Sequence, residues 1–151
     1  MALKEQIQID LKAALLGGDR FAGEVLRGLK AAILNEEVAS GKRDEGLTDE
    51  EIEKIIAREV KKRNESIKLY EQNDRNDLAE VEKKEAAVIA TYLPQQLSED
   101  EIRELAKAII AGIEGAGPSA MGQVIGTVKA KVGNTADGAT VAKVVKELLS
   151  A

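Results

Sequence analysis

The sequence predicts an all-α protein, and three observations support this fold class. Apolar residues recur at three- and four-residue steps along the chain, and no stretch shows the two-residue alternation of a strand. Hydrophobic residues make up 44% of the 151 residues but aromatic residues only 2%, and alanine is abundant, which suits closely packed helices. Two capping-box sequences, Thr48 to Glu51 and Ser98 to Glu101, mark helix starts.

Four helices are expected before Pro94. The first covers residues 2–16, and Asp19 caps the second, which fades near Ser40. The third and longest starts at the Thr48 box, and Asp77 is expected to cap the fourth. Pro94 ends the fourth helix because a residue before proline avoids helical geometry. The expected apolar stripes are Leu3, Ile7, Leu11 and Leu15; Ala22, Val25, Leu26, Leu29 and Ile33; Ile52, Ile55, Ile56, Val60, Ile67 and Tyr70; and Leu78, Val81, Val88, Ile89 and Tyr92.

Three shorter helices are expected after Pro94. The first of them starts at Ser98, and the second spans residues 119–132. The third follows a glycine-bounded turn at residues 133–138. Their stripes are Ile102, Leu105, Ile109 and Ile113; Met121, Val124, Ile125, Val128 and Val132; and Val141, Val144, Val145 and Leu148. The expected architecture is therefore an N-terminal four-helix subdomain, residues 1–94, followed by a C-terminal three-helix subdomain, residues 95–151.

The composition excludes several classes of chemistry. Without Cys or His the chain has no disulfide, no thiolate nucleophile, no Ser-His-Asp triad and no His-ligated metal. The sequence contains no calcium-loop or P-loop motif, so no catalytic, cofactor-binding or metal-binding residue is assigned. No apolar run reaches the ~20 residues of a membrane span. The N-terminus lacks a signal-peptide pattern, so a monomeric cytoplasmic protein without membrane contact is expected.

The acidic chain has a mildly basic end. Its net charge is -5, but residues 119–151 contain four lysines against Asp137 and Glu147. Three of the lysines, Lys129, Lys131 and Lys143, lie near the turn at residues 133–138. Backbone N–H groups at such a turn before a helix suit an anion. A plain helix-helix turn is the alternative interpretation.

Two further patterns allow a functional and a structural interpretation. Arg58, Lys61 and Lys62 share a helix face and could bind phosphates, although intrahelical pairs with Glu59 are the favoured interpretation. Gly122 and Gly126 lie four residues apart in an expected helix, where each costs about 1 kcal/mol relative to alanine. They create a strip for close approach of either a neighbouring helix, which is favoured, or a nucleic-acid backbone.

Four segments in this order resemble the GatB/YqeY family, and the whole chain is similar to a stand-alone YqeY-type protein. The segments are Arg58 to Arg63, Tyr92 to Ser98, Met121 to Gly126, and Ala136 to Gly138. The resemblance implies an all-helical two-part fold and a C-terminal part similar to the tail of the tRNA amidotransferase B subunit. One departure from the family pattern is Asp74-Arg75, where a Gly-Arg pair is expected.

The tail of that subunit helps to hold tRNA, so the resemblance also implies RNA contact. The matching positions are Gly122, Lys129, Lys131, Asn134 and Lys143. The amidotransferase active site lies in a domain without counterpart here. The family label, carbon-nitrogen ligase activity with glutamine as amido-N-donor, therefore describes the relatives' catalytic domain.

The resulting hypothesis is a non-catalytic RNA-binding accessory protein. Its expected partners are tRNA or an aminoacyl-tRNA amidotransferase complex. The alternative is a helical protein-interaction adaptor without RNA binding. A free-standing enzyme ranks last, because no converging set of titratable residues is visible.

Overall fold

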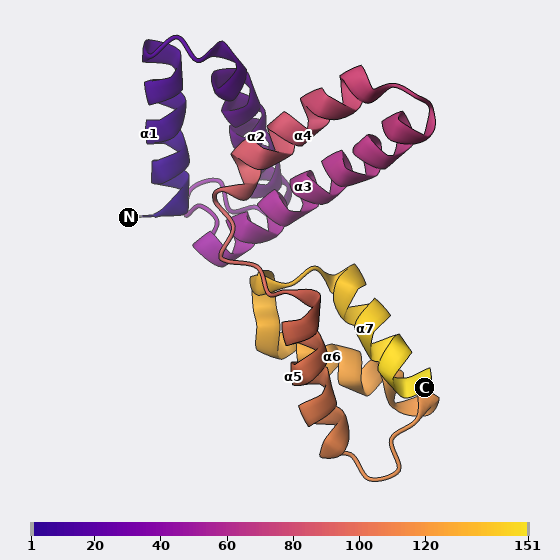
Figure 1. The fold of residues 1–151 in the computed structure, drawn as a ribbon. Coiled ribbons are helices and arrows are strands. Elements are labelled where there is room, and N and C mark those ends of the chain that lie inside the picture. Colours follow the sequence, from indigo (N-terminus) through magenta and orange to yellow (C-terminus); the bar gives the residue numbers. More distant parts are fainter. Residues whose placement is uncertain (1, 151) are drawn as a thin grey trace. The chain divides into compact units, whose positions relative to one another are not determined.

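The computed structural model describes residues 2–150 and confirms the all-α fold class, since this part of the chain contains helices and no strand. Figure 1 shows the helices in chain order. They are α1 Leu3–Leu16, α2 Arg20–Ala39, α3 Asp49–Gln72, α4 Asn76–Ala90, α5 Glu99–Ala111, α6 Met121–Val132 and α7 Gly138–Ser150, with short 3-10 helices η1 Pro118–Ala120 and η2 Gly133–Thr135. The chain divides into two compact units, Met1–Leu93 and Pro94–Ala151, and each is described by itself.

The N-terminal unit packs α1 to α4 around an isoleucine-rich core. The core side chains come from the expected stripes and are at most 6% exposed: Ile7, Val25, Leu29, Ile33, Ile52, Ile55, Ile56 and Ile89. Tyr92 closes the unit by donating a hydrogen bond of 2.6 Å from its hydroxyl to Oδ2 of Asp10. Burial, and then the Asp10 carboxylate, raise the pKa of Tyr92 above its usual range.

The helix ends follow the local chemistry with one exception. Thr48 and Glu51 form the complete capping box at the start of α3, and the Asp19 carboxylate accepts the N–H of Ala22 at the start of α2. Asp77 does not cap α4, because the helix begins one residue earlier, at Asn76. Its carboxylate instead pairs with Arg75, 3.2 Å away, and this contact lowers the pKa of Asp77.

The C-terminal unit packs α5, α6 and α7 against one another around a valine-rich core. The buried residues are Ile102, Ala106, Val124, Val128, Val132, Val141, Val144, Val145 and Leu149. Ser98 caps α5 as expected by accepting the N–H of Glu101. Leu149 is buried in the last turn, one residue beyond the expected Leu148. None of the helices among residues 2–150 is long and apolar enough to span a membrane.

Candidate nucleic-acid interface

Two glycines of α6 face open space. Gly122 and Gly126 are exposed, and a Cβ built on either one meets no other atom within 4 Å. No other helix of the C-terminal unit therefore packs against them, which argues against the favoured interpretation of the strip within this unit. Because glycine inside a helix costs about 1 kcal/mol relative to alanine, packing within the C-terminal unit does not account for their use on an exposed face.

Helical spacing aligns these glycines with a lysine. Residues 122, 126 and 129 follow one line along a helix, and Val124, Val128 and Val132 point to the opposite, buried side. We call Gly122, Gln123, Gly126, Lys129 and Ala130, all of which are exposed, the open face of α6. Lys131 is also exposed on this helix, but at about 100° per residue it points about 180° away from Gly122, so it is not part of the open face.

The open face lies in a segment without negative charge. Residues 115–136 contain no Asp or Glu, although charged residues make up 32% of the chain. Within the described residues, Lys129 and Lys131 take part in no ion pair. A Cβ placed on Gly138 would lie 3.3 Å from Cε and 3.4 Å from Nζ of Lys129, so this side chain lies across the start of α7. The two lysines are free to contact a phosphate.

The turn before α7 is less open to an anion than its sequence suggests. The carbonyl of Asn134 accepts a hydrogen bond of 2.9 Å from Nε2 of Gln96, and the carbonyl of Thr135 accepts one of 2.7 Å from the N–H of Leu97. Asp137 stands directly before α7, and its Oδ2 lies 3.3 Å from the hydroxyl of Thr140. The positive end of α7 thus carries its own carboxylate, and the open face of α6 is the better site.

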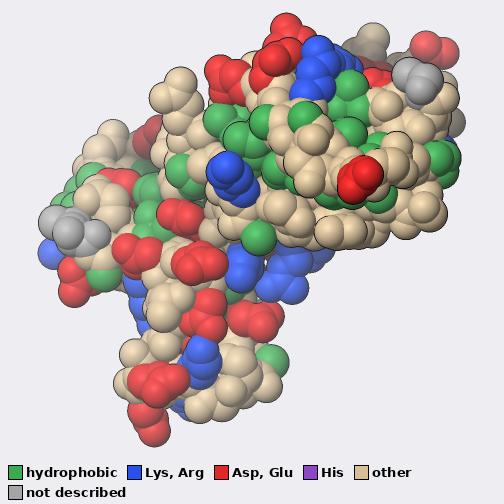
Figure 2. Space-filling view, turned by 90° about the horizontal axis from the view of Figure 1, so that it is seen from below, with side chains coloured by type: hydrophobic (Ala, Val, Ile, Leu, Met, Phe, Trp, Pro, Cys, Tyr) green, Lys and Arg blue, Asp and Glu red, His purple; other side chains and the backbone are tan. Residues whose placement is uncertain are grey.

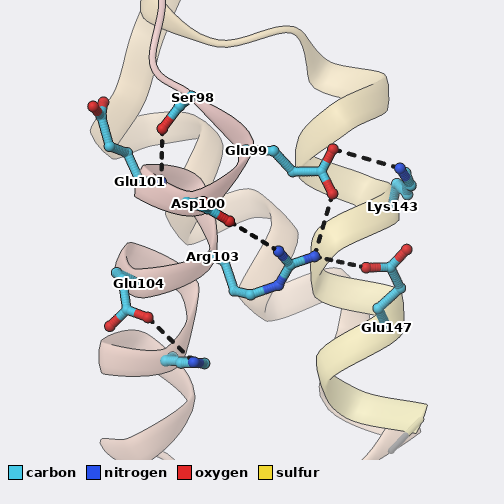
Figure 3. A network of polar contacts seen from close by, with 9 residues as sticks. Ser98, Glu99, Asp100, Glu101, Arg103, Glu104, Lys143 and Glu147 are labelled. Atoms are coloured by element: carbon cyan, nitrogen blue, oxygen red, sulfur yellow. Dashed lines mark hydrogen bonds and ion pairs between the residues drawn. The ribbon is translucent and has the colours of Figure 1, made fainter.

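Lys143 points to a different neighbour from Lys129. Its Nζ lies 3.5 Å from Oε2 of Glu99 on α5. Glu99 also accepts a 3.2 Å contact from Arg103, which reaches Glu147 of α7 at 2.9 Å, and Figure 3 shows these side chains bridging the two helices. The hydrogen bonds to Glu147 and then to Glu99 raise the pKa of Arg103. Lys143 therefore belongs to a network between α5 and α7.

The other three candidate cations belong to the N-terminal unit. Arg58 pairs with Glu36 of α2 at 3.4 Å, and Lys62 pairs with Glu59 at 3.4 Å. Only Lys61 of this group takes part in no ion pair within residues 2–150. In Figure 2, acidic and basic side chains lie close together over one part of the face in view, and hydrophobic side chains gather over another part. This group is thus mainly a paired, solvated helix face.

Comparisons with known proteins decide the family. The profile described as "Yqey-like protein" matches residues 4–149, nearly the whole chain. The chain belongs to the YqeY-like family. Curated relatives carry the name "Altered inheritance of mitochondria protein 41, mitochondrial". The protein from Clavispora lusitaniae is 31% identical over 105 residues, covering 68% of this chain and 59% of the relative. That from Pyrenophora tritici-repentis is 30% identical over 149 residues, covering 97% and 80%.

These relatives correct one expectation. The sequence predicts a cytoplasmic protein, but the curated relatives are named as mitochondrial proteins, which contradicts this expectation. Lack of a signal-peptide pattern and of a membrane span does not distinguish these compartments, and this is why the expectation was wrong. The chain spans 59% of the Clavispora relative's length and 80% of the Pyrenophora relative's length.

The structure brings two of the YqeY-like family segments together. The segment from Tyr92 to Ser98 supplies Gln96 and Leu97, which hold the turn preceding the Ala136 to Gly138 segment. Sequence reasoning did not assign a role to Gln96, because its two carbonyl partners, Pro94 and Asn134, lie 2 and 38 residues away. The ion pair between Glu99 and Lys143 was not predicted either, because these residues lie 44 positions apart. The pair between Glu99 and Arg103 has the i, i+4 spacing of a helix ion pair, and this spacing was the available signal.

Proposed function

We propose that this member of the YqeY-like family is a non-catalytic RNA-binding accessory protein that binds tRNA through the open face of α6. The observation that carries the proposal is the pair of exposed glycines in line with Lys129, in a segment without acidic residues. The glycines allow a sugar-phosphate backbone to approach the helix closely, and Lys129 supplies positive charge on the same face. Lys131, on the other side of the helix, adds only to the positive charge nearby. A relationship to the tRNA amidotransferase tail, with such a complex as partner, is part of this proposal.

The acidic whole chain limits the affinity that we expect. Two free lysines release few counterions, and a net charge of -5 repels RNA at a distance. Binding should therefore be weak and fall steeply as salt rises. A weak, salt-sensitive contact suits an accessory protein that gains affinity when a second partner holds the same RNA.

Fluorescence anisotropy with labelled tRNA at about 50 mM salt tests the proposal. The double variant Lys129→Gln/Lys131→Gln should bind about tenfold more weakly than the unaltered protein, because it loses the phosphate contact of Lys129 and a second positive charge near the site. The matched control is Lys12→Gln/Lys30→Gln, which removes the same charge from two exposed lysines of the N-terminal unit. An equal loss in both double variants would show only a net-charge effect and would refute the assigned face.

A cleft in the N-terminal unit favours a second candidate function, the protein-interaction adaptor. It lies between α1 and α2, has a volume of about 540 Å³, and is lined by Lys4, Glu5, Ile7, Gln8, Ile9, Lys30 and Ile33. Gly23 of α2 packs against Leu15 of α1 near the turn that joins these helices. The cleft lies between the other halves of the same two helices, away from this turn. Ile9 at this cleft is 48% exposed, an apolar side chain that a partner could cover.

Affinity capture from a nuclease-treated lysate separates the two candidates. Under the adaptor hypothesis, protein partners survive nuclease and are lost in an Ile9→Glu variant, which places a charge in the cleft. Under the RNA hypothesis, nuclease removes the captured material and Ile9→Glu has no effect.

A further inference from the structure

Glu99 forms an ion pair with Lys143. Its Oε2 lies 3.5 Å from Nζ of Lys143, and its Oε1 lies 3.2 Å from Arg103 (Figure 3). Arg103 also contacts Asp100 at 3.5 Å and Glu147 at 2.9 Å. The network thus holds three carboxylates against two cations. A phosphate that approaches Lys143 competes with Glu99 and meets a local excess of negative charge.

Lys143 lies close enough to the proposed site for one RNA strand to reach both. It lies five positions after Gly138, across which the side chain of Lys129 lies. At 1.5 Å per residue this is about 7.5 Å along α7. Lys143 is 59% exposed even in its pair with Glu99, so a phosphate has access to it. Exposed pairs at such distances are weak and can be exchanged for another anion.

We infer that Glu99 is an internal competitor of RNA, which lowers the affinity of the proposed site by holding Lys143. This inference rests on the proposed function. When a strand bound at α6 brings a phosphate to α7, Lys143 exchanges the Glu99 carboxylate for that phosphate, and Arg103 retains Glu99 on α5. An isolated or weakly bound anion does not displace Glu99 from Lys143. A polyanion that is already bound at Lys129 does displace it.

The test is a double-mutant cycle measured by anisotropy with labelled tRNA, using Glu99→Gln, Lys143→Gln and the double variant. Glu99→Gln keeps the size of the side chain and should bind tRNA about two- to fivefold more tightly, the factor that corresponds to a weak exposed pair. The gain should vanish in the Lys143→Gln background. The matched control is Glu104→Gln, because Glu104 lies on the same helix and pairs with Lys107 at 3.2 Å. It should give a clearly smaller gain.

The outcomes distinguish this inference from the proposed function. Equal gains for Glu99→Gln and Glu104→Gln, or a gain that persists without Lys143, overturn the competitor role while tRNA binding itself stands. If neither the unaltered protein nor Glu99→Gln binds tRNA, both the inference and the proposed function are wrong. Circular dichroism on each variant should show unchanged helix content, so that the affinities compare folded proteins.

Discussion

At the scale of single residues, Asp74 has a backbone conformation that residues other than glycine seldom adopt. It has φ +56, the left-handed region, and is the one non-glycine residue with positive φ in the described chain. It follows the C-cap of α3, where the N–H of Arg75 bonds to the carbonyl of Tyr70 at 2.8 Å, the pattern that ends many helices with glycine. The family resemblance expected glycine at this position.

Replacing Asp74 with glycine should therefore stabilise the protein. We expect a gain of about 0.5–1 kcal/mol in the free energy of unfolding, because glycine adopts this conformation without steric cost. Denaturant unfolding measures the change. Asp74→Ala is the control and should bring no gain, since alanine has the same steric cost; a gain of equal size with alanine would contradict the explanation.

A second residue-scale prediction concerns Glu51. Its hydrogen bond from Lys42, and then the bond from the Thr48 N–H, lower the pKa of Glu51 below its ordinary value. A depressed pKa in the folded state means stability that is present above the unfolded value of about 4.3 and lost as pH falls through the folded value. Glu51→Gln should lower the melting temperature at pH 7, and the difference should shrink below pH about 4. A difference independent of pH would contradict this role of the carboxylate.

At the scale of elements, one buried carboxylate joins α1 to α2. Glu37 is 1% exposed, and Nζ of Lys4 lies 2.6 Å from its Oε1. Lys4→Met should lower the free energy of unfolding by about 2–3 kcal/mol, because it leaves the buried charge of Glu37 unpaired. This is at or below the loss of about 3–5 kcal/mol that is usual for a fully buried pair, because Lys4 is 46% exposed. The double variant Lys4→Met/Glu37→Leu should recover most of this loss in denaturant unfolding. A double variant less stable than Lys4→Met would contradict the explanation.

The open face of α6 gives an element-scale prediction in which stability rises. Gly126→Ala should stabilise the protein by about 0.5–1 kcal/mol, because the added methyl group meets no atom and alanine favours the helix. Gly23→Ala is the contrast and should bring a smaller gain, since its Cβ would lie 2.9 Å from Cδ2 of Leu15 and that side chain must move away. Thermal unfolding measures both. No gain at Gly126 would mean that the glycine has a structural role.

The sequence predicted the helices well because their spacing and caps are local signals. The Thr48 and Ser98 caps and the core stripes of α2 and α3 lie where the pattern indicated. The Glu37–Lys4 pair and the hold of Gln96 on Asn134 were not predictable in this way, because each joins residues more than 30 positions apart. Likewise, only the structure shows that Gly126 faces open space rather than a helix.

At the scale of the whole molecule, each unit has its own core. Residues 94–151 enclose a valine-rich cluster that is composed only of residues from α5, α6 and α7 and their neighbours. We therefore expect a fragment of residues 94–151 to keep its helices, although a core of about this size gives only marginal stability. Far-UV circular dichroism and a cooperative thermal transition test this. A fragment that is unfolded at 10 °C would contradict it.

The most direct test of the central claim is to observe where tRNA contacts the protein. In a ¹⁵N-labelled full-length chain titrated with tRNA at low salt, the amide signals of Gly122, Gly126 and Lys129 should shift or broaden first, with those of α1 and α2 unchanged. The same titration at high salt should reverse these changes, because the contact is electrostatic. Perturbation confined to α1 and α2, or none at any tRNA concentration, would contradict the assignment of the open face of α6 as an RNA-binding surface.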